Sequence, residues 1–197
     1  MDILILGGTG AMGVPLVEIL KKEGHELYVT SRKKMISRDS LHYIQGNAKD
    51  PFFFSSLLNR KYDVIIDFMV YRTDELEKRL PELLSHTGQY CFFSSSRVYA
   101  ESKQPISEDS PRLLDICTDQ EYLHTDEYAL AKAREENLLK RNKEKNWTII
   151  RPYITYNDYR LQLGVYEKEN WLYRALQGRT VVLPKDIADR KTTLTYG

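Results

Sequence analysis

The feature that most constrains this sequence is a glycine-rich turn close to its N-terminus. An apolar segment at residues 3–6 leads directly into Gly7-Gly8-Thr9-Gly10-Ala11-Met12-Gly13, and residues 14–22 then carry apolar side chains at helical spacing. Because Gly7 and Gly10 lack side chains, main-chain N–H groups can approach a diphosphate closely, while Gly13 lets the helix pack against the strand. The pattern predicts a dinucleotide held by Gly7, Gly10, Ala11, Met12 and Gly13. A glycine-rich connection without a ligand is the alternative.

Strand-length apolar segments alternate with helix-period segments along most of the chain. The predicted strands are residues 3–6, 26–31, 41–45, 63–68, 89–95 and 147–151. The predicted helices are residues 14–22, 52–60, 74–85 and 126–145, and residues 101–125 are expected to form a long loop. This alternation predicts an α/β fold of the Rossmann type, a doubly wound parallel sheet with helices on both faces. In such sheets ligands bind beyond the carboxyl ends of the strands, where the strand order reverses.

Charge and composition narrow the class of partner. The 29 basic and 28 acidic residues leave a net charge of +1, so neither nucleic acid nor a membrane surface is an expected partner. The chain has no apolar run near the roughly 20 residues that span a bilayer, and it enters a strand pattern without a secretory leader. We therefore expect a cytoplasmic protein. Cys91 and Cys117 do not have the spacing of a metal site, and no metal is expected.

The end of the second predicted strand bears on the choice of cofactor. A carboxylate there would hydrogen-bond the ribose hydroxyls of NAD, but residues 30–34 read Thr-Ser-Arg-Lys-Lys. Ser31 can hydrogen-bond a 2′-phosphate and Arg32 can pair with it, so NADP is the preferred prediction and NAD the alternative. A solvated basic turn would explain the same residues. After the third strand, Asn47 is placed to meet the adenine, or it simply forms a turn.

Two further segments predict chemistry on a substrate hydroxyl. Tyr128 and Lys132 are four residues apart on a predicted helix, which puts the phenol and the ammonium on one face. A nearby cation favours the phenolate, and Tyr128 could then remove a proton while hydride passes to a nicotinamide ring. The fifth strand ends in three serines, Ser94 to Ser96, and a hydroxyl there could hold the reacting oxygen near the phenol. Turn and capping roles are the alternative for these serines.

Together these motifs resemble the extended short-chain dehydrogenase/reductase superfamily, which includes the nucleotide-sugar epimerases and dehydratases. The glycine loop, the serine-rich strand end with Tyr99 four residues after Ser95, the Tyr128/Lys132 pair and the segment 151–153 follow the family's order. The resemblance implies that Ser95 and Tyr128 are catalytic and that Lys132 is the catalytic and ribose-binding lysine. It also implies cofactor contacts from Phe68, Met69 and Tyr153. The expected activity is NAD(P)-dependent oxidoreduction or epimerisation of a nucleotide-activated sugar.

The resemblance also bears on domains and assembly. It implies a dinucleotide-binding domain at residues 1–155, followed at residues 156–197 by the start of an incomplete substrate-binding region, because family members are longer. It further implies a homodimer formed through the helix at residues 126–145.

Departures from the family pattern keep other functions open. Asn47 stands where many members have aspartate, and Asp67-Phe68-Met69 replaces a small-residue strand end. These features, with the segments at residues 146–152 and 171–176, are similar to a divergent branch that contains chloroplast stem-loop RNA-binding proteins. A cofactor-binding regulatory protein without turnover, or an RNA-binding protein of the same fold, are therefore the alternatives.

Overall fold

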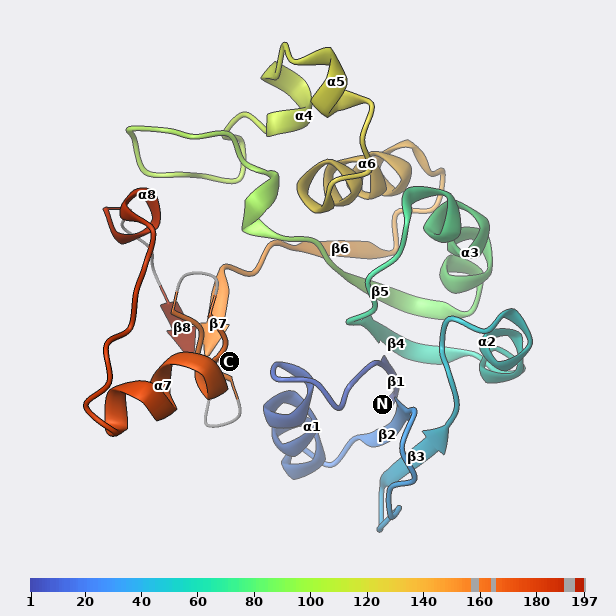
Figure 1. The fold of residues 1–197 in the computed structure, drawn as a ribbon. Helices are drawn as coiled ribbons and strands as arrows, with labels where there is room; N and C mark the ends of the chain where they lie inside the picture. The colour runs from blue at the N-terminus through green and yellow to red at the C-terminus, as the bar shows by residue number, and fades with distance from the viewer. Residues whose placement is uncertain (157–159, 164–165, 190–193, 197) are drawn as a thin grey trace. The chain divides into compact units, whose positions relative to one another are not determined.

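The fold is taken from a computed structural model, which describes residues 1–156, 160–163, 166–189 and 194–196 (Figure 1). By its internal contacts the chain divides into two compact units, Met1–Pro152 and Tyr153–Gly197.

The first unit contains a six-stranded parallel sheet. Its strands are β1 (Asp2–Leu6), β2 (Glu26–Ser31), β3 (Leu41–Gln45), β4 (Tyr62–Asp67), β5 (Thr87–Phe93) and β6 (Trp147–Ile150). They lie in the order β3-β2-β1-β4-β5-β6, from the lower to the upper end of the sheet in Figure 1. Central strand β1 pairs with β2 and β4, so Ile5 lies between Val29 and Ile66. This is the predicted Rossmann-type fold, with the order reversing between β1 and β4.

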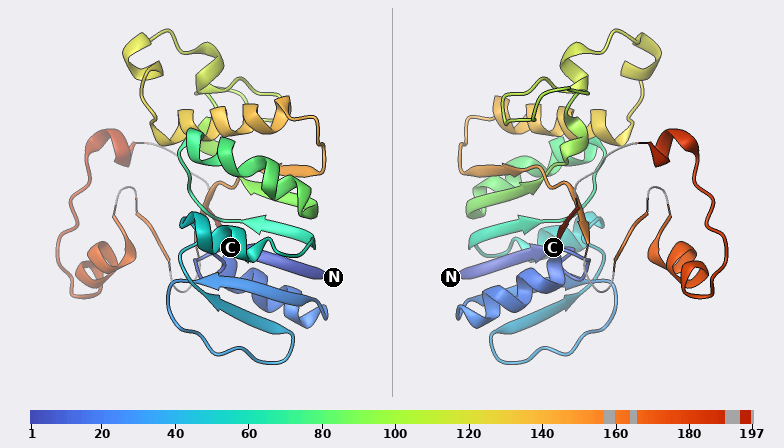
Figure 2. Two further views of the ribbon diagram at one scale, coloured as in Figure 1. Left: turned by 90° about the vertical axis from the view of Figure 1, so that its right-hand side faces the viewer. Right: turned by 90° about the vertical axis from the view of Figure 1, so that its left-hand side faces the viewer.

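Helices cover the two faces of this sheet unequally. The helices of the first unit are α1 (Gly13–Lys22), α2 (Pro51–Leu57), α3 (Thr73–Ser85), α4 (Leu113–Ile116), α5 (Gln120–Leu123) and α6 (Tyr128–Arg141). Because side chains alternate along a strand, Leu4 and Leu6 join an apolar cluster with residues of α2, α3 and α6. Ile3 and Ile5 pack with Val17 of α1 on the opposite face. Figure 2 shows α1 on one side of the sheet and α2 and α3 on the other.

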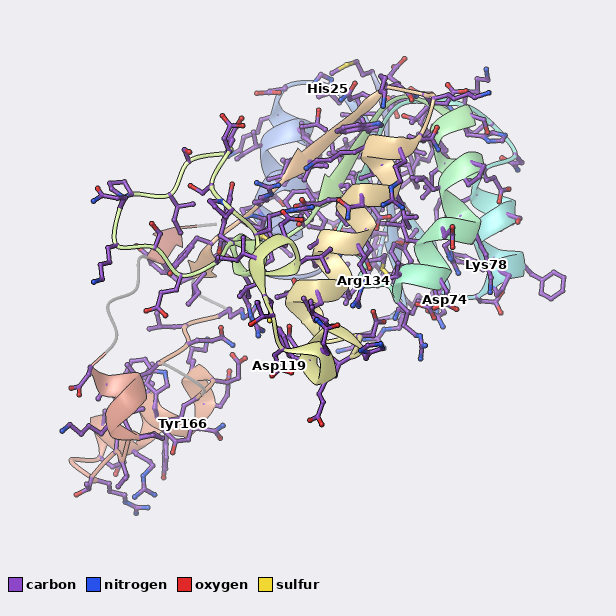
Figure 3. The ribbon with its side chains drawn as sticks, turned by 90° about the horizontal axis from the view of Figure 1, so that it is seen from above. His25, Asp74, Lys78, Asp119, Arg134 and Tyr166 are labelled. Atoms are coloured by element: carbon purple, nitrogen blue, oxygen red, sulfur yellow. The ribbon has the colours of Figure 1, made fainter. Side chains whose placement is uncertain are left out.

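The predicted long loop at residues 101–125 contains two short helices, α4 and α5. Asp119 begins α5 by accepting a hydrogen bond from the Tyr122 N–H at 3.0 Å. Arg134 reaches from α6 to the Thr125 carbonyl at 2.7 Å, and Figure 3 labels both Asp119 and Arg134. Side-chain caps and an anchoring arginine therefore order a segment whose apolar pattern is too irregular to predict helices.

Several other predicted boundaries differ from the structure by one to four residues, and the end of α2, at Leu57 rather than at residue 60, is one of them. Two of these differences have a local cause. Helix α6 ends at Arg141 rather than at residue 145, because the Asn142 N–H closes the last turn on the carbonyls of Leu138 and Leu139. Strand β5 ends at Phe93, two residues before the predicted end, because Ser95 instead caps the 3₁₀ turn η1 (Ser96–Val98).

The second unit consists of β7 (Ile154–Tyr156), α7 (Lys168–Leu176), α8 (Lys185–Ala188) and β8 (Leu194–Tyr196). Strands β7 and β8 pair in parallel. Among the helices that the structure describes in both units, none combines the length and apolar character needed to cross a bilayer.

Candidate functional site

A pocket of about 470 Å³ lies at the carboxyl rim of the sheet, where the strand order reverses. It is formed by the glycine loop after β1 and by the segments that follow β2, β3 and β4. Its lining residues are Gly7, Thr9, Gly10, Thr30, Ser31, Arg32, Gly46, Asn47, Ala48, Lys49, Phe68, Met69 and Val70. Nine of the thirteen are glycines or polar residues from the glycine loop and from the ends of β2 and β3 and the residues that follow them, and we call this cavity the rim pocket.

The glycine loop keeps its backbone open to the rim pocket. Gly7 has φ of +72°, a conformation that L side chains rarely adopt, and its N–H donates to Thr30 Oγ1 at 2.9 Å. A Cβ on Gly10 would be 3.8 Å from the Gly7 carbonyl oxygen, which is ordinary contact, whereas a Cβ on Gly13 would be 2.4 Å from the Gly8 oxygen. Gly13 is thus required for packing, and Gly10 leaves space at the pocket.

Helix α1 presents its N-terminus next to this loop. Within the part of the chain that the structure describes, no side chain caps this end, and its first turn has no acidic residue. The Val14 N–H donates to the Gly10 carbonyl at 3.0 Å and Pro15 has no N–H, so this helix end offers a diphosphate mainly its partial positive charge. Ala11 and Met12 lie in the segment that leads into this helix rather than among the residues that line the rim pocket.

The residues after β2 and β3 combine two exposed cations, Arg32 and Lys49, with two turn-forming side chains. Ser31 is buried and its hydroxyl accepts from the Lys33 N–H at 3.1 Å. Asn47 Oδ1 similarly accepts from the Lys49 N–H at 3.1 Å. Arg32 is exposed in the pocket lining, and among the described residues its guanidinium has no ion-pair partner. The pocket lining contains no carboxylate at this position, which leaves Arg32 available to an anionic group.

The structure brings Ser95 and Tyr128 into neighbouring elements, joined by Arg97. The Ser95 hydroxyl accepts from the Arg97 N–H at 3.2 Å, and η1 packs against α6. The Arg97 guanidinium carbon is 5.4 Å from the centre of the Tyr128 ring, and its Nη2 pairs with Glu127 Oε1 at 2.8 Å. Glu127 also caps α6 by accepting from the Ala129 N–H at 2.8 Å. Arg97, which sequence reasoning did not select, therefore supplies positive charge beside the phenol.

Lys132 lies one turn after Tyr128, but its ammonium points into the core. The side chain is 2% exposed, and Nζ is 2.9 Å from Glu135 Oε2 and 4.6 Å from the centre of the Phe92 ring. Across the described residues, neither Lys132 Nζ nor the Glu135 carboxylate has a hydrogen-bond partner elsewhere. Burial raises the pKa of Glu135 to about 7, although the charge of Lys132 opposes this shift. Lys132 is not among the residues that line the rim pocket.

A second buried carboxylate, Glu136, fastens three distant segments together. It accepts from Ser94 Oγ at 2.6 Å, from Arg112 Nη1 at 3.1 Å and from Arg151 Nε and Nη2, both at 2.8 Å. Burial alone would raise the pKa of Glu136, but the hydrogen bonds from Arg151 and Ser94 outweigh it, so the pKa lies below its usual value. The ionised carboxylate holds the loop before α6 and the end of β6 beside the serine-rich strand end.

The remaining predicted residues fall in different parts of the chain. Phe68 and Met69 line the rim pocket, as expected, and the Phe68 ring lies 4.3 Å from that of Phe93. Tyr153 belongs to the second unit, and its expected place beside the nicotinamide stays a prediction.

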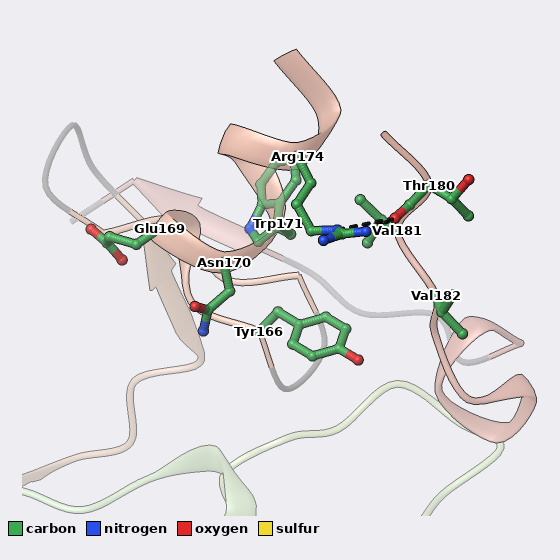
Figure 4. Close-up of a pocket in the computed structure, with 8 residues that line it drawn as sticks. All are labelled: Tyr166, Glu169, Asn170, Trp171, Arg174, Thr180, Val181 and Val182. Carbon is green, nitrogen blue, oxygen red and sulfur yellow. Dashed lines mark hydrogen bonds between the residues drawn. The ribbon is translucent and has the colours of Figure 1, made fainter. Parts of the chain in front are cut away.

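The second unit has a pocket of its own, of about 500 Å³ (Figure 4). Its lining combines aromatic rings with a guanidinium: Tyr166, Glu169, Asn170, Trp171, Arg174, Thr180, Val181 and Val182. Arg174 Nε and Nη2 both donate to the Thr180 carbonyl, at 3.1 and 3.0 Å, and Trp171 Nε1 donates to the Leu161 carbonyl at 3.1 Å. These hydrogen bonds tie α7 to the segments on either side of it.

The sheet order, the glycine loop and the rim pocket define a Rossmann-type α/β protein with a candidate dinucleotide site. A sequence model of the NAD dependent epimerase/dehydratase family matches residues 3–186, and the chain belongs to this family.

Two curated relatives and one solved structure show the range of proteins that this chain is similar to. The chain is 32% identical to the chloroplast stem-loop binding protein of 41 kDa b of Arabidopsis thaliana, over 92% of this chain and 48% of that protein. It is 30% identical to the UDP-glucose 4-epimerase of Lactobacillus helveticus, over 56% of this chain and 41% of that enzyme. The structure of UDP-glucuronic acid 4-epimerase from Bacillus cereus in complex with NAD superposes with a TM-score of 0.64 at 16% identity, covering 91% of this chain and 64% of that one. The chain thus spans about half the length of the curated relatives.

The two glycines near the start of α1 allow packing and binding to be separated. We expect Gly10→Ala to fold with a loss of about 1 kcal/mol or less, because its Cβ meets only ordinary contacts. The same methyl group narrows the rim pocket, so the dissociation constant for NADH, measured by calorimetry, should rise about tenfold. Gly13→Ala should instead lower the free energy of unfolding by about 1–3 kcal/mol, because its Cβ would overlap the Gly8 carbonyl. Equal stability losses in the two variants would contradict this assignment.

The buried pair on α6 predicts a pH-dependent stability. Lys132→Met leaves Glu135 without its partner, and we expect a loss of about 3 kcal/mol at pH 8, with a smaller loss at pH 5 where the carboxyl is protonated. The double variant Lys132→Met/Glu135→Leu should recover most of this loss, because an apolar pair of similar volume avoids desolvation.

The direction of the pH effect follows from the raised pKa of Glu135. Because its folded value of about 7 lies above the ordinary value of 4.5, the stability that this group contributes is present below pH 4.5 and is lost as the pH rises through 7. In urea unfolding, the free energy of unfolding of the double variant, taken relative to that of the wild type, should therefore be higher at pH 8 than at pH 5. A constant difference between the two proteins would rule out Glu135 as the titrating group.

Proposed function

We propose that this protein binds a nicotinamide dinucleotide in the rim pocket and uses it for hydride exchange with a nucleotide-activated sugar. The observation that carries the proposal is the rim pocket itself, in which a glycine loop, an uncapped helix N-terminus and an exposed arginine meet where the strand order reverses. The family to which the chain belongs is described as NAD dependent, which agrees with this chemistry.

The residues of the rim pocket fit such a cofactor. Gly7 and Gly10 carry no side chain and so leave space for a diphosphate beside α1, while their own N–H groups donate to Thr30 Oγ1 and to the Gly7 carbonyl. Asn47 and Met69 would border the adenine and the ribose. When bound, the nicotinamide ring would supply the hydride donor or acceptor. We favour NADP over NAD because Arg32 is exposed and unpaired among the described residues, and because Ser31 adds a hydroxyl beside it.

Proton transfer is assigned to Ser95 and Tyr128. The Tyr128 phenol would exchange a proton with the reacting sugar hydroxyl, and the Ser95 hydroxyl would hold the same oxygen by a hydrogen bond. Lys132 lies one turn further along α6 and matches the lysine that the family places near the tyrosine. Its ammonium forms an ion pair with Glu135 in this protein. Arg97 is a second cation beside the Tyr128 ring.

The substrate class is proposed from the relatives. Two of the similar proteins are named for UDP-glucose and UDP-glucuronic acid. A homodimer through α6 stays part of the proposal; within the first unit this helix already buries residues on several sides.

A second candidate is the binding of a nucleic-acid stem-loop. It is favoured by the 32% identity, over 92% of this chain, to a chloroplast stem-loop binding protein. The near-balanced charge of this chain speaks against a continuous phosphate track. A protein that shifts a hairpin RNA in a salt-sensitive way and binds neither NADH nor NADPH would support this candidate and overturn the first.

Variants of the two hydroxyl residues test the catalytic assignment. With UDP-glucose or UDP-glucuronic acid as substrate, Tyr128→Phe should lower the rate of cofactor reduction by about 10²-fold or more, with NADH binding changed by less than about twofold. Ser95→Ala should behave similarly, whereas Ser95→Thr keeps the hydroxyl and should retain activity. Stopped-flow absorbance at 340 nm measures the rate. Wild-type cofactor binding without turnover on any sugar nucleotide would instead indicate a regulatory protein.

Arg32 tests the choice between the two cofactors. Arg32→Gln should raise the dissociation constant for NADPH roughly tenfold, because it removes a charge-assisted hydrogen bond to the 2′-phosphate. The value for NADH should change by less than about twofold, since NADH has no such phosphate. Arg38→Gln, an equal charge change at an exposed residue outside the pocket lining, is the control. Equal losses for both nucleotides would refute the NADP assignment.

A further inference from the structure

Asp67 ends β4 and is buried in the core, with 1% of its surface exposed. All its hydrogen-bond partners are donors. Oδ1 accepts from the Met69 N–H at 2.9 Å, and Oδ2 accepts from the Tyr90 hydroxyl at 2.9 Å and the Tyr71 hydroxyl at 3.1 Å. Burying a carboxylate in an apolar core lowers stability unless hydrogen bonds replace its hydration, and these three contacts provide them.

The turn that Asp67 holds is a wall of the rim pocket. Phe68, Met69 and Val70 all line the pocket, and a Cβ placed on Gly7 would be 3.1 Å from Met69 Sδ. The Phe68 N–H donates to the Leu6 carbonyl at 3.0 Å, which keeps the turn aligned with β1. The position of this wall therefore depends on one main-chain hydrogen bond to β1 and one to the buried carboxylate.

We propose that Asp67 is a positioning residue of the dinucleotide site, which acts through Met69 to fix the wall opposite the glycine loop. An apolar side chain would fill the same core space without the cost of desolvation, but it could not hold the Met69 N–H. The inference rests on the proposed function, because it names the rim pocket as the site that Asp67 shapes.

The ionisation of the surrounding groups supports these hydrogen-bond directions. Burial raises the pKa of Asp67, and the hydrogen bonds from Met69 and Tyr90 and the charge of Lys132 oppose that rise. Burial also raises the pKa of both Tyr71 and Tyr90 well above 10, so both hydroxyls remain donors at neutral pH. Lys132 thus contributes a counter-charge to the core beneath the pocket as well as to Glu135.

A matched pair of tyrosines separates positioning from general stability. Tyr90→Phe removes a buried hydroxyl that donates to Asp67 at 2.9 Å, and Tyr62→Phe removes one that donates to the Leu57 carbonyl, also at 2.9 Å. Both rings belong to the same apolar cluster. We expect similar losses in thermal stability, but only Tyr90→Phe should raise the dissociation constant for NADPH or NADH, by roughly fivefold. Asp67→Asn keeps the shape and one acceptor, and it should fall between the wild type and Tyr90→Phe.

A second readout needs no cofactor. In hydrogen exchange, the amides of residues 68–70 should exchange faster in Tyr90→Phe and Asp67→Asn than in the wild type, and Tyr62→Phe should leave them unchanged. If the wild type binds no dinucleotide, the proposed function fails, while the exchange rates still report whether Asp67 holds the turn. If the wild type binds and the three variants bind alike, or exchange is unaltered at residues 68–70, the positioning role is wrong.

Discussion

The parallel pairing of β1 with β2 on one side and β4 on the other governs the site. The segment after β1 leads into α1 on one face of the sheet, whereas the segment after β4 leads into α3 on the other face. The rim between these two strands is therefore left open, and the loops after β1, β2, β3 and β4 surround it. The N-terminus of α1 lies next to this opening, and the buried carboxylate at the end of β4 holds the turn that lines it.

Much of this arrangement could be predicted from local sequence. The glycine loop, the strand ends and the helix spacing of Tyr128 and Lys132 are short-range patterns, and the fold that they indicate is the one observed. Strand β2 and strand β3 begin and end where hydrophobic alternation indicates. Local sequence does not predict conformation where tertiary contacts determine it. An example is the segment before α6, which is held in place by Arg112 and Arg134.

The surroundings of the candidate catalytic residues were beyond prediction for a related reason. A spacing of four residues shows that Tyr128 and Lys132 share a helix face, but it does not show that this face turns inward at the lysine. Lys132 and Glu135 are three residues apart on α6, but the burial of this pair depends on how α6 packs on β5, which is set by residues far away in sequence. Asp67 is a similar case, because its partner Tyr90 lies 23 positions further along the chain.

The hydrogen bonds that converge on Glu136 limit which substitutions this protein can accept. One carboxylate serves the loop at Arg112, the strand end at Ser94 and Arg151 directly after β6, so loss of either arginine leaves part of the buried charge uncompensated. Replacing one residue of this network alone then lowers the stability of the fold, even where the new side chain would fit the space. Across homologues, positions 94, 112, 136 and 151 should therefore covary, exchanging together as a set rather than drifting independently.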